Sequence, residues 1–365
     1  MVKKITNLRK KINIKMIRNI ILFLGLIALT YWLIFKDQDM GELYKLIKST
    51  NKIYLILGAL VMFMYYVMEA FNIKCLLKIF GDKASLFSSL KYTFIGFFFS
   101  AITPAATGGQ PIEIYYMNKD NHSGPNSTLI MLIQLCGFQI STILLGIICA
   151  IINHNIFSGG LFWLFLLGLT INGLALFIML VCIFSKETSK KIINIFLKLM
   201  KKLKVKKLEE KKKDIYNGLE KYNESAIFIK NNRLEFIKAI TRVFIQIIFY
   251  YSVPFFVYKS FGLSGYNYIQ IFMMQAILYT TVSSLPLPGA IGISETIFLK
   301  IFKPVFGKKL ISGSMLLSRG ITFYLYVIVS LIVVIITAIK TKDIKSEIDK
   351  KVVKYDEATS NNKSK

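Results

Sequence analysis

The chain has 365 residues, of which 54% are hydrophobic, and its mean hydropathy is +0.54. The apolar residues are gathered in segments of membrane-crossing length, which excludes a soluble globular protein. A formal net charge of +27 would indicate nucleic-acid binding in a soluble chain, but most lysines lie between the apolar segments, where the positive-inside rule places them.

Six apolar segments are continuous and long enough to cross ~30 Å of hydrocarbon as helices. The first follows a basic N-terminus, and no small-residue cleavage site comes after it, so we expect a retained span rather than a signal peptide. The expected fold class is therefore an all-α integral membrane protein, a polytopic helical bundle. The six predicted spans are Asn19–Phe35, Ile53–Phe71, Ser127–Ile152, Phe157–Phe184, Phe236–Tyr258 and about Leu310–Lys340.

Two further apolar regions, Leu86–Pro111 and Tyr268–Pro304, are each interrupted near the middle by Pro and Gly. Lipid offers no water to satisfy an interrupted backbone, so we interpret both regions as broken or re-entrant hairpins. The first contains the sequence TPAATGGQPIEIYYM (103–117), and the second contains LPLPGAIGISE (285–295).

The two breaks repeat one spacing: Pro104 precedes Glu113 by nine residues, and Pro286 precedes Glu295 by nine. The repeat indicates a possible inverted-repeat architecture. Gly lets backbone approach closely and Pro ends a helix without an unsatisfied donor, so each break can present N–H groups to a phosphate. The alternative is that the kinks reflect irregular packing alone. The carboxylate that ends each break favours function, because ionisable groups inside a membrane are usually functional.

The basic segments predict orientation. The N-terminus, the loop 74–91, the segment 186–213 and the tail 340–365 all fall on the cytoplasmic side if each hairpin returns to the face it entered. The first hairpin then enters from the cytoplasm and the second from outside, as in inverted-topology transporters. The expected domains are a basic cytoplasmic N-terminus (1–18), a transmembrane domain (19–339) with a Lys-rich loop between its halves (185–235), and a polar cytoplasmic tail (340–365).

The lysine-rich segment Lys186–Lys213 has two interpretations. Its interleaved apolar residues are typical of an amphipathic interfacial helix, which would dock on anionic lipid or tRNA. The alternative is a solvated cytoplasmic loop between two halves, since runs of charge are often no more than that.

Arg319 lies about nine residues into the last span, roughly 13 Å deep, and so needs a partner. Glu295, Glu113 or a lipid phosphate could supply it. A fixed pair that only holds two helices together and a functional site are both open interpretations.

Glu235, Lys238, Arg242 and Gln246 recur at helical spacing and predict one polar stripe, with Arg242 its deepest charge. Arg242 faces a wet interior or anchors the helix at the interface. Glu69 is interpreted as an interface residue.

No metal or cofactor is expected. The cysteines show no CxxC spacing, and the two histidines are 32 residues apart without a neighbouring Cys or acidic cluster. These residues are Cys75, Cys136, Cys149, Cys182, His122 and His154.

Three motifs carry a family resemblance: TPAATGGQPIEIYYM (103–117), PLPGAIGISE (286–295) and LLSRGITFYL (316–325). With them the chain resembles, from roughly Asn19 to Ile339, the lysylphosphatidylglycerol synthase transmembrane region. This family is also called the flippase-like domain and forms the membrane half of the multiple peptide resistance factor.

The resemblance implies a multi-pass bacterial plasma-membrane protein with both termini cytoplasmic. It implies a flippase or transporter for an anionic or aminoacylated phospholipid, with phosphatidylglycerol or its lysyl form as the partner. Such a protein would lower the negative charge of the outer leaflet and give resistance to cationic antimicrobial peptides.

Two alternatives stay open. In the first, the chain is a phosphatidylglycerol lysyltransferase, with tRNA as a partner, or the membrane subunit of a separate synthase chain. In the second, it is a non-transporting scaffold. The 25 residues after Lys340 are too few and too polar for a catalytic core, so we expect no lysyl transfer by this chain alone.

The sequence predicts no catalytic residue. The candidate substrate-binding residues lie at the two breaks and at the two deep arginines: Pro104, Gly108, Gly109, Gln110, Glu113, Tyr115, Arg242, Pro286, Pro288, Gly289, Gly292, Glu295 and Arg319.

Overall fold

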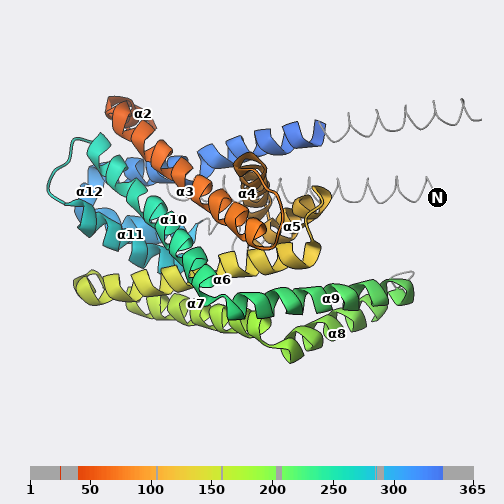
Figure 1. The fold of residues 1–365 in the computed structure, drawn as a ribbon. Coiled ribbons are helices and arrows are strands. Elements are labelled where there is room, and N and C mark those ends of the chain that lie inside the picture. Colours follow the sequence, from red (N-terminus) through yellow and green to blue (C-terminus); the bar gives the residue numbers. More distant parts are fainter. Residues whose placement is uncertain are drawn as a thin grey trace, which may run out of the picture.

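The computed structural model describes residues 40–103, 106–157, 159–202, 208–283 and 292–339, together with Gly25 and Leu285. Within these ranges the chain is helical and forms no strand (Figure 1). The helices are α2 (Met40–Ser49), α3 (Lys52–Ile79), α4 (Leu86–Ala101), α5 (Gly109–Lys119), α6 (Gly124–Ile152), the short η2 (His154–Ile156), α7 (Leu161–Phe184), α8 (Lys186–Lys202), α9 (Leu208–Asn231), α10 (Arg233–Ser260), α11 (Tyr268–Val282), α12 (Ile293–Arg319), the π-helical η4 (Gly320–Tyr324) and a last helical stretch over 325–339.

Five helical segments of the described chain are long and apolar enough to cross a membrane: α3, α6, α7, α10 and the segment Ile293–Ile339. They confirm five of the six predicted spans. The sixth, Asn19–Phe35, lies outside the described residues. Helix α3 continues eight residues beyond the predicted end at Phe71, so polar residues near that end lie further inside the helix than the apolar pattern indicated.

Helices α3 and α10 form the centre of the bundle and run antiparallel along each other (Figure 1). The backbone N–H of Asn51, just before α3, donates to the carbonyl of Ser260, the last residue of α10, at 2.8 Å. The start of α3 and the end of α10 therefore lie at one end of the bundle. Helices α6, α11 and α12 complete the main apolar core around this pair.

Helices α4 and α5 form the first predicted hairpin. Helix α4 has 16 residues, about 24 Å at 1.5 Å per residue, which is too short to cross the hydrocarbon. Ser85 and Ser88 cap its start reciprocally. After it, Ala106 adopts a positive φ of 53°, which a non-glycine residue rarely does, and α5 returns along α4.

The second hairpin consists of α11 and the first part of α12. Helix α11 has 15 residues and also starts with a reciprocal cap, between Asn267 and Gln270. Helix α12 is broken at Gly307, whose φ of 67° favours glycine. Residues 293–306 therefore complete the hairpin, and the chain from 308 to 339 forms the last span.

The two hairpins open at opposite ends of the bundle. Helix α4 follows the end of α3 and α5 precedes the start of α6, whereas α11 follows the end of α10. Because α3 and α10 are antiparallel, the α4–α5 hairpin enters from one end and the α11–α12 hairpin from the other (Figure 1). The described chain thus has the inverted arrangement that the repeated spacing indicated.

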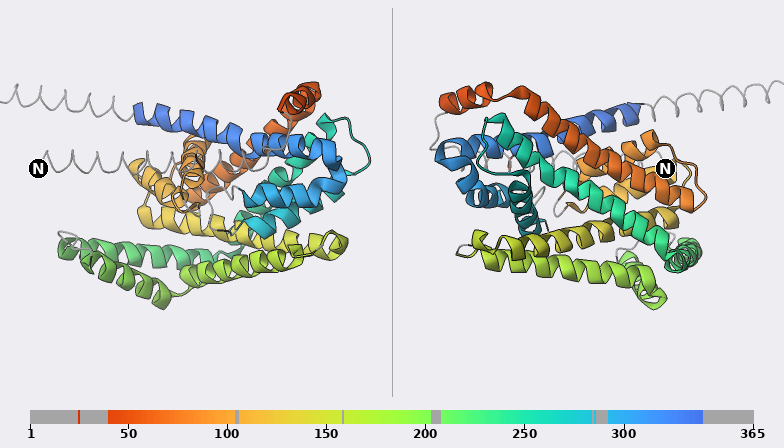
Figure 2. Two further views of the ribbon diagram at one scale, coloured as in Figure 1. Left: turned by 180° about the vertical axis from the view of Figure 1, so that it is seen from behind. Right: turned by 60° about the vertical axis from the view of Figure 1, so that its left-hand side comes forward.

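The segment between the two halves is a pair of helices, α8 and α9, that extends past the end of the bundle (Figures 1 and 2). The hydroxyl of Tyr216 on α9 donates to Asn194 Oδ1 on α8 at 2.6 Å, and Leu197 and Leu219 are buried. Helix α8 thus packs apolar residues against α9. Ile195, in contrast, is 58% exposed.

Candidate functional site

Glu295 stands at the start of α12, directly after the second break, and its side chain is fully buried. Its Oε2 accepts hydrogen bonds from the backbone N–H of Gly292 at 2.7 Å and from the hydroxyl of Ser294 at 2.8 Å. Gly292 has a φ of 91°, which only glycine adopts readily. The carboxylate therefore closes the first turn of the helix and fixes how the chain leaves the break.

Arg319 binds the other oxygen of the same carboxylate. Its Nε lies 2.8 Å from Oε1 of Glu295, and its side chain is 12% exposed. The guanidinium carbon also lies 4.6 Å from the centre of the Phe323 ring. The pair forms because the chain reverses at Gly307, which brings the two ends of α12 together. Between the two carboxylates considered as partners for Arg319, it is Glu295 that pairs with it in this structure.

Gly108 and Gly109 pack the first hairpin together. The N–H of Gly108 donates to Thr103 Oγ1 at 2.9 Å, and a Cβ on Gly108 would lie 2.7 Å from Thr103 Cγ2. A Cβ on Gly109 would lie 2.8 Å from the carbonyl oxygen of Gly96 on α4. In this structure both glycines therefore serve close helix packing, and Gly108 uses its N–H within the hairpin.

The other predicted residues of α5 face different ways. Glu113 is 4% exposed and faces α4, where a Cβ on Gly96 would overlap its carboxyl group. Gln110 is half-buried, and Tyr115 is 58% exposed on the outside of the bundle. Glu113 thus belongs to the interior, and Tyr115 does not.

A buried chain of hydrogen bonds joins α3, α6 and α10. Arg242 donates to Asn72 Oδ1 at 2.8 Å, and the Asn72 amide donates to Gln134. Gln134 donates to Gln246 Oε1 at 2.9 Å, and Gln246 donates to Glu69 Oε2 at 2.9 Å. Asn72, Gln134 and Gln246 are all less than a tenth exposed. We call these five residues the polar chain.

The polar chain corrects part of the sequence interpretation. Arg242 and Gln246 join the interior hydrogen bonds, which is one of the two interpretations left open for Arg242. Glu235 and Lys238, in contrast, form a 2.7 Å ion pair at the exposed start of α10. Sequence reasoning missed Asn72. The available signal was its position three residues after Glu69, on one face of an otherwise apolar helix.

A cluster of tyrosine rings lies between the polar chain and the Glu295–Arg319 pair. The ring centres of Tyr65 and Tyr250 are 5.8 Å apart, and those of Tyr250 and Tyr279 are 5.1 Å apart. Tyr65 interacts electrostatically with Glu69, and Tyr250 with both Arg319 and Glu295. The polar chain, the tyrosine rings and the Glu295–Arg319 pair thus all lie within one apolar bundle.

The structure brings Gly292, Glu295 and Arg319 together, and it places Arg242 in the separate polar chain. Glu113 and the two packing glycines form the inner face of the first hairpin. Four predicted site residues lie outside the described residues: Pro104, Pro286, Pro288 and Gly289.

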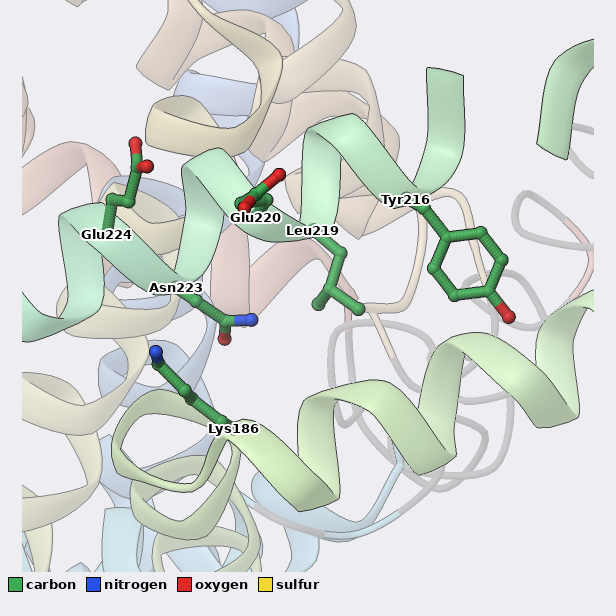
Figure 3. Close-up of a pocket in the computed structure, with 6 residues that line it drawn as sticks. All are labelled: Lys186, Tyr216, Leu219, Glu220, Asn223 and Glu224. Atoms are coloured by element: carbon green, nitrogen blue, oxygen red, sulfur yellow. The ribbon is translucent and has the colours of Figure 1, made fainter. Parts of the chain in front are cut away.

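A shallow pocket lies between α8 and α9, away from both breaks (Figure 3). Lys186 extends from α8 towards Asn223 on α9. None of the candidate site residues that the structure describes lines this pocket. The six residues that line it are Lys186, Tyr216, Leu219, Glu220, Asn223 and Glu224.

The fold and the interior define a polytopic α-helical membrane protein with two short helical hairpins that enter from opposite ends. The family model described as the lysylphosphatidylglycerol synthase TM region matches residues 20–330, so the chain belongs to this family. It is also similar to a UPF0104 membrane protein of the archaeon Archaeoglobus fulgidus, at 24% identity over 321 residues. That match covers 87% of this chain and 96% of the relative.

Proposed function

We propose that the protein moves an anionic or aminoacylated phospholipid, of the lysylphosphatidylglycerol type, across the membrane. One observation carries the proposal: two hairpins open at opposite ends of the bundle, and the second ends in a buried Glu295–Arg319 pair. In transporters, helices interrupted near the midplane bind substrate and rearrange for alternating access. The family to which the chain belongs points to the same class of lipid.

In this mechanism Arg319 exchanges its carboxylate partner for a lipid phosphate. A guanidinium grips phosphate and carboxylate with the same planar fork of donors, so the exchange keeps the cation paired. The polar chain and the tyrosine cluster provide hydrogen-bonding groups for the headgroup, while the acyl tails stay in lipid. Glu295, once released, keeps its hydrogen bonds from Gly292 and Ser294.

The proposed setting is a bacterial plasma membrane with both termini and the α8–α9 pair on the cytoplasmic side. The lysines of α8 and α9 support this orientation through the positive-inside rule. Export of a lysyl lipid would lower the negative charge of the outer leaflet and repel cationic peptides.

The test uses purified protein in phosphatidylglycerol vesicles that contain a fluorescent phosphatidylglycerol, with the outer leaflet quenched chemically. Wild-type protein should make the inner-leaflet probe accessible faster than protein-free vesicles do. Arg319→Lys keeps the charge but loses the planar fork, and should slow this movement at least tenfold. Lys303→Gln, an exposed change on the same helix, is the matched control and should leave the rate unchanged. Movement no faster than in protein-free vesicles would refute the proposal.

The family name favours a second candidate, a membrane subunit that works beside a separate lysyltransferase chain. Under that candidate the purified protein forms no lysyl lipid from lysyl-tRNA and phosphatidylglycerol by itself. It would also move no lipid, but would raise product formation when the separate transferase is added. The vesicle assay therefore separates the two candidates.

A further inference from the structure

Glu113 is a buried acid whose position is prepared by the fold. The residue projects from α5 into α4 at Gly96, the point where any larger residue would overlap the carboxyl group. It is 4% exposed, and its Oε2 has no hydrogen-bond partner among the described residues. A carboxyl group in such a position is held by packing, while its charge is left without compensation.

Other orphan polar atoms line the same region. The hydroxyls of Ser89 and Thr93 on α4 are buried without hydrogen-bond partners in the described chain. Their spacing to Gly96 places all three residues on one face of α4, the face that α5 covers. On α3, the Tyr66 hydroxyl is likewise buried and without a partner. The region is polar enough to accept a small charged species.

A second carboxylate repels the negative charge of Glu113. Glu69 on α3 interacts repulsively with Glu113, and its own hydrogen bond comes from the neutral amide of Gln246. No described Lys, Arg or His forms an ion pair with either acid, because Lys91 binds Asp120 and Arg242 donates to Asn72.

The remaining titratable groups on the neighbouring helices do not compensate this charge. On α6 the only titratable side chains are the thiols of Cys136 and Cys149. On α4, Tyr92 donates to Asp120. On α5, Tyr115 is exposed and Lys119 lies over the ring of Tyr116.

We propose that Glu113 binds a proton inside the membrane, and that this proton is the coupling ion of the transport cycle. A buried carboxylate that has no cation beside it, and one oxygen without a hydrogen-bond donor, does not stay ionised in a low-dielectric interior, so it takes a proton. A metal cation is a poorer occupant, since no group of three or more metal-ligating acidic, His or Cys side chains exists in the described chain.

Binding of the proton converts the carboxylate of Glu113 into a neutral carboxylic acid, and its release restores the carboxylate, without any change of oxidation state. Glu69 is also the last member of the polar chain, and Tyr65 links it to the tyrosine cluster beside Arg319. Loss of the proton from Glu113 adds a negative charge to the interior of the bundle. This coupling rests on the proposed lipid transport.

The experiment has two arms. In the first, infrared spectra of the reconstituted protein at pH 7 should contain a carboxylic-acid carbonyl band that shifts in heavy water. Glu113→Gln should remove this band, and it should stay folded because its amide has the shape of the neutral acid. Glu220→Gln, at an exposed carboxylate on α9, should leave the band unchanged. Absence of the band in folded wild-type protein would overturn the proton site.

In the second arm, lipid movement is measured with and without a pH gradient across the vesicles. Wild-type movement should change several-fold on imposing the gradient, and the Glu113→Gln rate should not respond to it. Wild-type movement that ignores the gradient would overturn the coupling. Reconstituted protein that moves no lipid under any gradient would refute the proposed function, while the infrared arm would still decide whether Glu113 binds a proton.

Discussion

Arg319 and Glu295 lie 24 residues apart in the sequence, yet their side chains meet at 2.8 Å because the chain turns back at Gly307. The contact ties the second break to the last span, residues 308–339. It therefore links the hairpin to the span that follows, and it is the natural place to test both the stability and the function of this half.

Removing one partner of this pair should destabilise the protein strongly. Glu295→Gln or Arg319→Gln leaves a buried charge without its partner, and each should lower the free energy of unfolding by about 3–5 kcal/mol. The double variant should lose clearly less than the sum, because neither charge remains. Denaturant unfolding in detergent measures the free energy of unfolding of all three variants. Single variants as stable as the wild type would show that the pair contributes nothing to the fold.

Replacing either of two glycines on α7 by alanine should change the stability of the protein, but in opposite directions. A Cβ on Gly168 would overlap the backbone carbonyl of Thr280 on α11, which cannot move aside, whereas nothing lies within 4 Å of Gly173. Gly168→Ala should therefore separate α7 from α11 and cost about 1–3 kcal/mol. Gly173→Ala should gain about 0.5–1 kcal/mol from helix propensity. Thermal unfolding that ranks the two variants the other way would contradict the packing of these helices.

The polar chain should be more sensitive to substitution than the exposed start of the same helix. Arg242→Gln removes the donor to Asn72 Oδ1 in the interior and should cost about 1–3 kcal/mol. Lys238→Gln breaks the exposed pair with Glu235 and should cost less than about 1 kcal/mol. Equal losses in chemical unfolding would mean that Arg242 is an interfacial anchor after all.

Asp120, in the turn between α5 and α6, should contribute to acid sensitivity. Partial burial raises its pKa, but hydrogen bonds from Lys91 and Tyr92 outweigh this and leave the pKa below its usual value. A lowered pKa in the folded state stabilises the protein above the unfolded pKa of about 3.9, and this stability is lost as the pH falls through the folded value. Asp120→Asn should flatten the dependence of stability on pH below about 4. An unchanged dependence of stability on pH would exclude Asp120 as a source of acid sensitivity.

Cysteine labelling in intact cells tests the orientation. Asn155, in η2, and Lys221, on α9, are both exposed. They lie near opposite ends of α6, because Ser225 on α9 donates a hydrogen bond to Asn126 at the start of α6, whereas η2 follows its end. In a background without the four native cysteines, Asn155→Cys should react with an impermeant thiol reagent, whereas Lys221→Cys should react only after the cells are opened. Labelling of Lys221→Cys from outside would reverse the proposed topology.

The spans were predictable because lipid demands about twenty apolar residues for each crossing, and this signal needs no knowledge of tertiary contacts. The hairpins were predictable for a related reason, since Pro and Gly are conspicuous where a helix should continue. Glu295 was among the partners expected for Arg319, but the choice depended on the reversal at Gly307, a single glycine between apolar residues and two lysines.

The interior polar groups were harder to predict. Glu69 was interpreted as an interface residue because its depth was judged from the end of the apolar run at Phe71, whereas α3 continues to Ile79. The hydrogen bonds of the polar chain join residues from three helices that are up to 177 positions apart, as in Gln246 and Glu69. Helical periodicity indicates which face is polar, but it does not indicate which faces of different helices meet.

The π-helical turn Gly320–Tyr324, directly after Arg319, sets the rotation of everything that follows. A π turn holds one residue more than an α-helical turn, so it advances the side-chain directions by about 100°. Downstream, Tyr326 and Ser330 face the core, while Ile328 and Ile332 are exposed. If the same residues formed a regular α-helical turn, Ile328 and Ile332 would turn towards the core and Ser330 towards the lipid. Deleting one residue from the turn would instead let the helix become regular and leave these directions unchanged. The apolar outer face of the last helix thus depends on a wide turn that accommodates one supernumerary residue beside the arginine.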